Sequence, residues 1–413
     1  IWFNLLLVQT LTTMFRLRAH GKKPITITTT TASSFLYWSP ESSPTTLSSP
    51  TNMDPTIWSN LPNHLLEHIL SLLPFKTLLT LRSISRHLRS LILSPSFISD
   101  HSFSLPSFLL LSHPQSFNSF PLFNPNLISW CTLPLPRSLS LTNASSLLSS
   151  SNGLLCFSIS PSSVSSLSIF NPLTRSSRSI KLPCYPFPFE LLSLVTSPDG
   201  YKIFTLCSSS SAASSRSVCL YDSGDRSWRK FGGVDQVLPR GFNQDGVFYN
   251  GSLYFARSEP FLIVSVDLND GKWTTATGDG VFPADNEITF ARLVSDPEKK
   301  ILYMVGGIGS NGICRSIKIW EFKEETESWI EVETLPDIVC KKFTSVCYHN
   351  YEHVYCLWHK EMICVCCYNW PEILFFHVGR RTWHWVPKCP SLPEKWSCGF
   401  RWFSYVPSLS ASV

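Results

Sequence analysis

An apolar residue followed seven positions later by a tryptophan recurs along the second half of this chain. The four clear copies are Tyr221 to Trp228, Val266 to Trp273, Phe322 to Trp329 and Phe376 to Trp383. Their tryptophans are 45, 56 and 54 residues apart, and a weaker copy without the tryptophan runs from Phe170 to Ser177. Repeats of about 40 to 50 residues that are built from short strands are typical of β-propellers.

A strand-like segment precedes each copy of this repeat. The segments are NGLLCF (152–157), YKIFTL (201–206), GSLYFA (251–256), ILYMVGG (301–307) and HVYCLW (353–358). No unit shows sustained helical periodicity, which excludes a solenoid of helix pairs. Five units are visible, and either FLLLS (108–112) or RWFSYVP (401–407) could complete a sixth. The sequence therefore predicts an all-β propeller of six blades over residues 151–407.

The recurrent tryptophans are interpreted as structural. A blade of four strands cannot bury both of its faces alone, and a tryptophan supplies a large buried area where two blades meet. Gly306-Gly307 after an apolar strand, with Trp329 at the end of the same unit, resembles the kelch repeat, although the glycines are clear only here. The resemblance implies a kelch-type propeller with structural roles for Gly306, Gly307, Trp228, Trp273, Trp329 and Trp383.

Residues 58–93 show a different, helical pattern. Two adjacent apolar faces follow Pro62, one formed by Leu65, Ile69, Leu72 and Leu73 and the other by Leu66, Leu70 and Leu73. Pro74 ends this run, because a helix rarely continues up to a proline. A second helical pattern follows, and its apolar side chains are predicted to point inward: Leu81, Ile84, Leu88, Leu91 and Ile92. So short a segment builds only a small core. One apolar face is therefore expected either to remain exposed for a partner or to pack on the body of the same chain.

This stretch resembles the F-box, the small helical module that docks a protein onto the Skp adaptor of a cullin ubiquitin ligase. The resemblance lies in Leu61-Pro62, in the paired apolar residues that follow and in the SISRHLRSLI tail. It implies that the adaptor contacts are Leu61, Pro62, Leu65, Leu66, Ile69, Leu70, Leu73 and Pro74. Leu88 stands where the family usually has tryptophan, so it is expected to keep an apolar docking contact with less area. An F-box followed by a kelch-like propeller is the order found in plant F-box proteins.

No motif indicates an enzyme. Gly307-x-Gly309-x-x-Gly312 matches a dinucleotide fingerprint as a string, but an alternating strand pattern follows where that motif needs a helix, so a hairpin is predicted. Cys364 and Cys367 lie in an apolar run and lack the second ligand pair of a zinc site, so a buried strand is predicted. No metal or cofactor site is predicted. A galactose-oxidase-like propeller enzyme, which needs a copper site of Tyr, Cys and His side chains, stays open as an alternative.

The remaining segments are assigned by composition. The sequence predicts a disordered leader at 1–53 upstream of a true start at Met53, with a transit peptide as the alternative, and the helical module at 54–98. A connector with a possible first strand, for which FLLLS (108–112) is the best candidate, is predicted at 99–150, and a tail at 408–413. The serine-rich patches Ser145–Ser151 and Ser208–Ser217 are predicted to be flexible loops.

The net charge and the arrangement of the cysteines limit the classes of partner and the cellular compartment that the sequence predicts. The net charge is +5, from 34 basic and 29 acidic residues, and the basic residues do not cluster with aromatic ones, which argues against nucleic acid. Beyond the short apolar run in the leader, nothing approaches the roughly 18 apolar residues that span a membrane, so no membrane partner is expected. The 14 cysteines form no disulfide framework, so reduced thiols in the cytoplasm or nucleus are predicted.

Together these features predict an α+β multidomain protein, with a small all-α F-box module followed by an all-β kelch-type propeller. The family resemblance implies a substrate-recognition subunit of an SCF-type ubiquitin ligase. Its F-box would bind the Skp adaptor, and through it a cullin, while the propeller would hold an unknown protein target. Such a subunit is not an enzyme, because it acts by bringing the target close to a ubiquitin-loaded enzyme. A propeller binding module that works without a ligase is the alternative.

Overall fold

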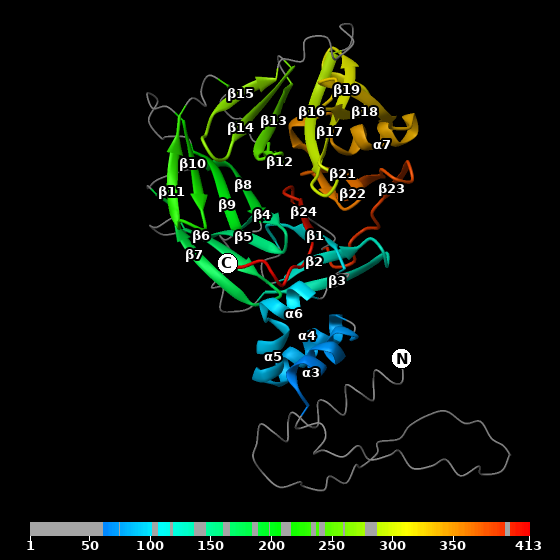
Figure 1. Cartoon of the computed structure of the whole chain (residues 1–413). Helices are drawn as coiled ribbons and strands as arrows, with labels where there is room; N and C mark the ends of the chain where they lie inside the picture. The colour runs from blue at the N-terminus through cyan, green and yellow to red at the C-terminus, as the bar shows by residue number, and fades with distance from the viewer. Residues whose placement is uncertain are drawn as a thin grey trace, which may run out of the picture. The chain divides into compact units, whose positions relative to one another are not determined.

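The chain divides into two compact units, Ile1–Ser104 and Leu105–Val413, in its computed structural model (Figure 1). The structure describes residues 61–73, 75–100, 106–115, 119–135, 146–159, 166–183, 189–197, 199–207, 216–232, 237–238, 244–258, 261–276, 287–392 and 397–413. The predicted leader at 1–53 lies outside these residues. Within the described ranges, no helix is long and apolar enough to cross a membrane.

Four short helices form the described part of the first unit: α3 (Asn63–Ser71), α4 (Phe75–Ile84), α5 (Arg86–Ile92) and α6 (Pro95–Asp100). The second helical pattern of the sequence is therefore two helices, and the break falls at Ser85. The backbone of Ser85 is extended, and its hydroxyl accepts a hydrogen bond from the His87 N–H. A serine N-cap of this kind stabilises a helix start by about 1 kcal/mol, so the sequence starts a new helix at this point.

One apolar core joins these helices. Its buried members are Leu66, Leu70, Leu73, Leu78, Leu81, Leu88, Leu91, Ile92 and Phe97. The inward orientation predicted for Leu81, Leu88, Leu91 and Ile92 is confirmed, and Ile84 packs against this core while staying partly exposed. Of the two apolar faces on α3, the one with Leu66, Leu70 and Leu73 is the face that this core uses.

The described residues of the second unit form six four-stranded antiparallel sheets, numbered here as blades 1 to 6 from inner to outer strand. Blade 1 has β24 (Arg401–Tyr405), β1 (Phe108–Ser112), β2 (Ser119–Asn124) and β3 (Ser129–Pro134); blade 2 has β4 (Ser146–Ser151), β5 (Leu154–Ile159), β6 (Ser166–Asn171) and β7 (Ser176–Lys181); blade 3 has β8 (Phe189–Ser197), β9 (Gly200–Cys207), β10 (Ser217–Asp222) and β11 (Ser227–Phe231). Blade 4 has β12 (Val247–Tyr249), β13 (Ser252–Ser258), β14 (Phe261–Asp267) and β15 (Trp273–Ala276); blade 5 has β16 (Glu287–Asp296), β17 (Ile301–Ser310), β18 (Ile313–Lys323) and β19 (Ser328–Thr334); blade 6 has β20 (Val354–His359), β21 (Met362–Cys367), β22 (Trp370–His377) and β23 (Thr382–Trp385). The prediction of a six-bladed propeller is confirmed.

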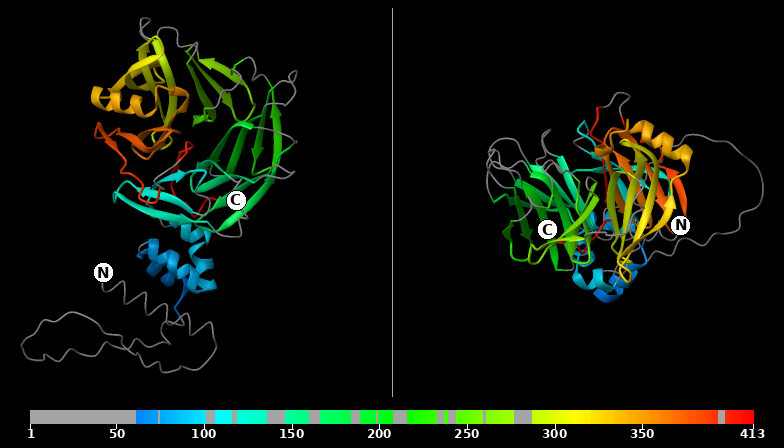
Figure 2. Two further views of the ribbon diagram at one scale, coloured as in Figure 1. Left: turned by 180° about the vertical axis from the view of Figure 1, so that it is seen from behind. Right: turned by 90° about the horizontal axis from the view of Figure 1, so that it is seen from above.

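The ring is closed by a strand from the end of the chain. β24 pairs with β1 in antiparallel register, from Phe108 opposite Tyr405 to Ser112 opposite Arg401. The two segments that could each have completed a sixth unit therefore lie side by side in the same blade. Figure 2 shows this blade, with cyan strands from the start of the propeller and red chain from its end, between the green blade 2 and the orange blade 6. Inner strand β24 also contacts β4 of blade 2 and β20 of blade 6, which joins the two ends of the ring.

A separate apolar cluster fills each junction between neighbouring blades. Six such clusters lie in the described part of the propeller, one for each pair of blades around the ring. The cluster between blades 5 and 6 also includes α7 (Asp337–Val346), the helix that connects these blades. Because each blade is covered by its neighbours, the propeller is held by six layers of packing around its axis.

The spacing of seven residues in the repeat is the geometry of the outer hairpin of a blade. Tyr221 lies opposite Trp228 in the pairing of β10 with β11, and Phe322 lies opposite Trp329 in the pairing of β18 with β19. The pairs Val266–Trp273, Phe376–Trp383 and Phe170–Ser177 are equivalent. Each of these tryptophans is half-buried against the cluster that its blade shares with the preceding blade. The indole of Trp228 also donates a hydrogen bond of 2.9 Å to the Lys181 carbonyl in blade 2.

Blade 1 contains a copy of this repeat that the sequence reasoning missed. Phe123 lies opposite Trp130 across β2 and β3, again seven residues apart, and their ring centroids are 5.2 Å apart. The turn between the strands ends at Ile128, which has a left-handed φ of 48°. Arg175, Arg226, Glu327 and Arg381 hold the same turn position with φ between 47° and 58°. The apolar-to-tryptophan spacing alone would have revealed this copy.

Gly306 and Gly307 lie inside strand β17, at a place where aromatic side chains come close to the backbone. A Cβ on Gly307 would lie 2.4 Å from Thr289 Oγ1 and 2.5 Å from the Phe290 ring. A Cβ on Gly306 would lie 3.0 Å from the ring of Trp320. The glycines leave room for the rings of Phe290 and Trp320 to cover the strand, as glycine in a strand interior often does.

Two segment assignments differ from the structure. The predicted connector at 99–150 contains strands β1, β2 and β3 and most of β4, so the propeller begins before residue 151. Most of the serine-rich patch Ser145–Ser151 is strand β4 rather than a flexible loop, and Ser151 donates or accepts a hydrogen bond of 2.9 Å with Thr196 Oγ1 of blade 3. Inner strands that are covered by neighbouring blades can be made of small polar residues when those residues find hydrogen-bond partners.

The predicted tail at 408–413 packs on blade 2 through Asn171. The buried Asn171 amide donates hydrogen bonds of 2.9 Å to the Ser408 carbonyl and 2.8 Å to the Ala411 carbonyl. Its Oδ1 accepts from the N–H groups of Leu173 and Thr174 in the turn of its own blade.

We expect Asn171→Ala to lower the free energy of unfolding by about 2–4 kcal/mol, because it leaves several buried polar groups without partners. Urea denaturation of the full chain measures this. Asn124→Ala is the matched control, since Asn124 makes the same turn bonds to the N–H groups of Asn126 and Leu127 in blade 1. An equal loss in both variants would contradict a contribution from the tail.

Candidate functional site

Helix α3 carries an apolar face that the core of its own unit leaves exposed. Leu65 is 44% exposed and Leu72 is 71% exposed, although both are large apolar residues. Ile69 lies between them on the same face and is half-buried, and Pro62 is exposed at the start of the helix. The spacing i, i+4 and i+7 places the three side chains along one stripe. We call Pro62, Leu65, Ile69 and Leu72 the α3 face.

The eight residues predicted to contact the adaptor lie in different environments in the structure. Leu66, Leu70 and Leu73 are buried in the core, and Leu61 packs against it. Pro62, Leu65 and Ile69 lie on the α3 face, and Pro74 lies outside the described residues. Leu72 is the most exposed apolar side chain of the face and was missing from the predicted set. Its position seven residues after Leu65 was the signal that could have included it.

Leu88, the departure from the F-box pattern, lies in the core and not on the α3 face. Its side chain is fully buried among the apolar residues of α3, α4 and α5. The expectation that Leu88 gives a smaller docking contact is therefore wrong, because this side chain has no exposed surface in the described unit.

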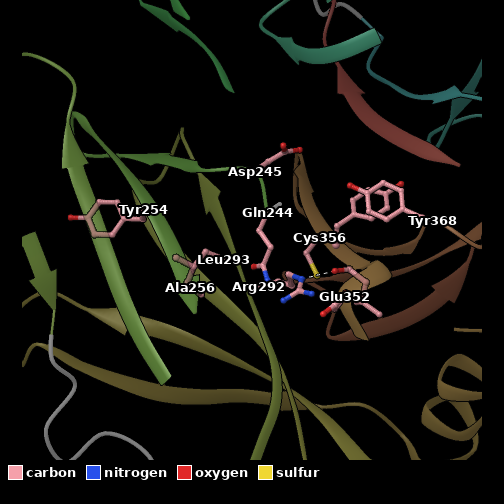
Figure 3. Close-up of a pocket in the computed structure, with 11 residues that line it drawn as sticks. Gln244, Asp245, Tyr254, Ala256, Arg292, Leu293, Glu352, Cys356 and Tyr368 are labelled. Carbon is pink, nitrogen blue, oxygen red and sulfur yellow. Dashed lines mark hydrogen bonds between the residues drawn. The ribbon is translucent and has the colours of Figure 1, made fainter. Parts of the chain in front are cut away.

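The propeller has a small polar pocket beside its inner strands (Figure 3). Its volume is about 40 Å³, which is room for little more than water. Arg292 lines this pocket, and its guanidinium donates hydrogen bonds to the carbonyls of Ala291, Tyr351 and Val354. Burial lowers the pKa of Arg292 to about 10, so the side chain is still charged at neutral pH. Through its hydrogen bond to the Val354 carbonyl of β20, Arg292 of β16 joins blades 5 and 6.

The cysteine run of blade 6 is a buried strand, as predicted. Cys364, Cys366 and Cys367 lie in β21, and burial raises the pKa of each thiol above its usual value. A raised pKa keeps a thiol protonated and unreactive. In the described ranges, no group of three or more His, Cys, Asp and Glu side chains is arranged to hold a metal ion.

The glycine string is also structural. Gly307 and Gly309 lie in β17, Gly312 lies in the turn, and β18 follows directly. A hairpin is thus found where the dinucleotide motif would need the N-terminus of a helix. The hairpin prediction is confirmed.

Comparison with known proteins agrees with this architecture. The F-box domain matches residues 58–100, and the KIB1-4 beta-propeller matches residues 122–356. An F-box/kelch-repeat protein of Arabidopsis thaliana is 97% identical over 403 residues, which is 97% of this chain and 100% of that protein. The chain belongs to the F-box/kelch-repeat protein family. The α3 face lies in the part that matches the F-box.

More distant relatives match most of the chain. F-box only protein 6 of Arabidopsis thaliana is 26% identical over 355 residues, covering 82% of this chain and 71% of that protein. Protein UNUSUAL FLORAL ORGANS of the same plant is 22% identical over 372 residues, covering 82% of this chain and 80% of that protein. F-box/kelch-repeat proteins are typically substrate adaptors and not enzymes.

Proposed function

We propose that this chain is a substrate-recognition subunit of an SCF-type cullin ubiquitin ligase. Its F-box unit binds a Skp adaptor through the α3 face, and its propeller binds the protein to be ubiquitinated. The observation that carries the proposal is the exposure of Leu65 and Leu72 in a unit whose core is already complete with Leu66, Leu70 and Leu73. Exposed apolar stripes on a domain this small mark a partner surface.

The subunit acts without bond chemistry of its own. A target held on the propeller has its lysines at a high effective concentration near the ubiquitin-loaded enzyme, which is an effect of proximity. The cysteines in the described part of the chain form no disulfide, which supports a location in the reducing cytoplasm or nucleus. A fluorescent fusion of the full chain that entered the secretory pathway would contradict that location.

The test of the adaptor role is a binding measurement with a purified plant Skp adaptor. We expect Leu65→Asp combined with Leu72→Asp to weaken binding roughly 100-fold or more, because two central apolar contacts are replaced by charges that must be desolvated. The unfolding transition should change little, since both side chains are exposed in the free chain. Calorimetric titration and circular dichroism measure the two effects.

Leu127→Asp is the matched control, because Leu127 is 73% exposed on the β2–β3 turn of the propeller and its change should leave adaptor binding intact. Leu70→Asp places a charge in the core and should unfold the F-box unit, so it marks what a folding defect looks like. If the wild-type chain binds no Skp adaptor, the ligase role is wrong. If the double change binds the adaptor as tightly as the wild type, docking through the α3 face is wrong.

A further inference from the structure

An open groove lies on blade 5 where α7 meets the turn between β17 and β18. Its volume is about 750 Å³, which is within the range of about 300–1,000 Å³ common for ligand sites. The residues that line it are Ile313, Cys314, Arg315, Cys340, Lys341, Thr344, Ser345, Tyr348 and His349. We call it the α7 groove. In a blade of four antiparallel strands, the turn between the second and third strands and the connection to the next blade lie at the same end. This topology brings the two elements together.

The hydroxyl and thiol groups on the described floor of the groove already donate to backbone carbonyls. Cys314, Cys340 and Thr344 are buried there. The Thr344 hydroxyl donates to the Cys340 carbonyl, the Cys340 thiol to the Arg315 carbonyl and the Cys314 thiol to the Ser316 carbonyl. A small polar ligand needs several convergent hydrogen-bonding groups, which this floor lacks. The floor suits an apolar side chain instead.

The rim of the groove is apolar and basic. Ile313 and Tyr348 are large, exposed apolar residues, and Tyr348 is 76% exposed. Arg315, Lys341 and His349 line the same groove, and none of its described lining residues is acidic. Lys342, the neighbour of Lys341, pairs with Glu372, whereas Arg315 and Lys341 form no ion pair with a described residue. Ile338 lies one turn before Lys341 on the exposed side of α7 and extends the apolar surface.

The backbone that presents Tyr348 is held in a strained but well-bonded turn. Tyr348 and His349 both have left-handed φ values, of 51° and 54°, a conformation that costs an L-residue free energy. The N–H groups of Tyr348 and His349 donate to the carbonyls of Ser345 and Thr344. The Tyr351 hydroxyl accepts a hydrogen bond of 2.8 Å from the Cys314 N–H and lies 2.9 Å from His349 Nδ1. The rim is thus preorganised, which reduces the entropy lost on binding.

From these features we infer that the α7 groove binds an acidic segment of the target protein, with an aliphatic or aromatic side chain on the floor and flanking Asp or Glu residues against Arg315 and Lys341. Nucleic acid is not the expected ligand, because it needs a row of phosphate contacts and the groove offers two cations beside an apolar floor. The inference rests on the proposed function, because it names the class of target that the ligase subunit would recognise.

The test selects binding peptides from a random 12-residue library displayed on phage, with the immobilised full chain as bait. We expect selected peptides to combine Asp or Glu with a large apolar residue. Fluorescence polarisation of a selected peptide should show about tenfold weaker binding or more to the Arg315→Glu/Lys341→Glu variant, and a similar loss for Tyr348→Ala. No enrichment, selected peptides without acidic residues, or equal binding to these variants would overturn the inference.

Lys299→Glu combined with Lys300→Glu is the matched control, because it makes the same charge change on exposed residues at the opposite end of blade 5. Its peptide binding should equal that of the wild type. Measurement of Skp-adaptor binding on the same variants separates the two proposals. Groove variants that keep adaptor binding and lose the peptide support the groove. A wild-type chain that binds the peptide and no adaptor supports the groove and contradicts the ligase role.

Discussion

Removal of residues 401–413 is expected to prevent the propeller from folding. Strand β24 is the inner strand of blade 1. Without it β1 has an unpaired edge, and blade 1 loses the contacts of its inner strand with β4 of blade 2 and β20 of blade 6. Trp402 belongs to the buried cluster between blades 6 and 1, and Phe403 and Tyr405 belong to the cluster between blades 1 and 2. Truncating one buried aromatic residue to alanine costs about 3–5 kcal/mol. The combined loss of three such residues is comparable to the whole free energy of unfolding of a typical domain, which is about 5–15 kcal/mol.

Soluble yield, size-exclusion elution and the thermal unfolding transition of the truncated chain measure this effect. The control is a chain that ends at Ser408, which keeps β24 and loses the Asn171 bond to the Ala411 carbonyl. That control should fold and unfold cooperatively, with a stability lower by about 1–2 kcal/mol. A cooperative transition of the truncated chain at the wild-type temperature would show that the ring does not depend on β24.

Much of the propeller could be read from the sequence because its repeat is set by local geometry. A turn of four residues that ends in a left-handed residue puts an apolar residue opposite a tryptophan. This spacing survives differences in loop length between blades. The missed copy from Phe123 to Trp130 obeys the same rule. Its neighbourhood is rich in proline and serine, so composition pointed to a connector while the spacing pointed to a blade.

The strand β4 and the exposed face of α3 could not be predicted from local sequence patterns, because both depend on contacts between segments that are distant in the sequence. The serine-rich β4 has the composition of a loop, and it is a strand because β5 pairs with it and Ser149, Ser150 and Ser151 find partners in neighbouring blades. The same limit applies to α3. Both of its faces are apolar, so periodicity predicted that one would be exposed but could not tell which, because that depends on where α4 and α5 pack.

Substitution of Arg292 by methionine is expected to destabilise the propeller by about 3–5 kcal/mol, although the volume of the side chain is nearly kept. Arg292 is 5% exposed, and its guanidinium donates to carbonyls from β16, from β20 and from the short helix η3 (Tyr351–His353). Methionine removes these three buried hydrogen bonds from a charged donor, and each lost bond costs about 1–3 kcal/mol. Thermal unfolding should move down by on the order of 10 °C.

Arg292→Lys is the graded comparison, because one ammonium group cannot reach all the carbonyls that the planar guanidinium reaches. Its unfolding temperature should lie between those of the methionine variant and the wild type, and equal values for all three would contradict the role of these hydrogen bonds. Arg292 also connects the core to the α7 groove, since it bonds the carbonyl of Tyr351, and the Tyr351 hydroxyl accepts from Cys314 in the groove floor. The Arg292→Met variant should therefore also bind the selected acidic peptide more weakly at temperatures where it is still folded. Unchanged peptide affinity there would show that the groove keeps its shape without this connection.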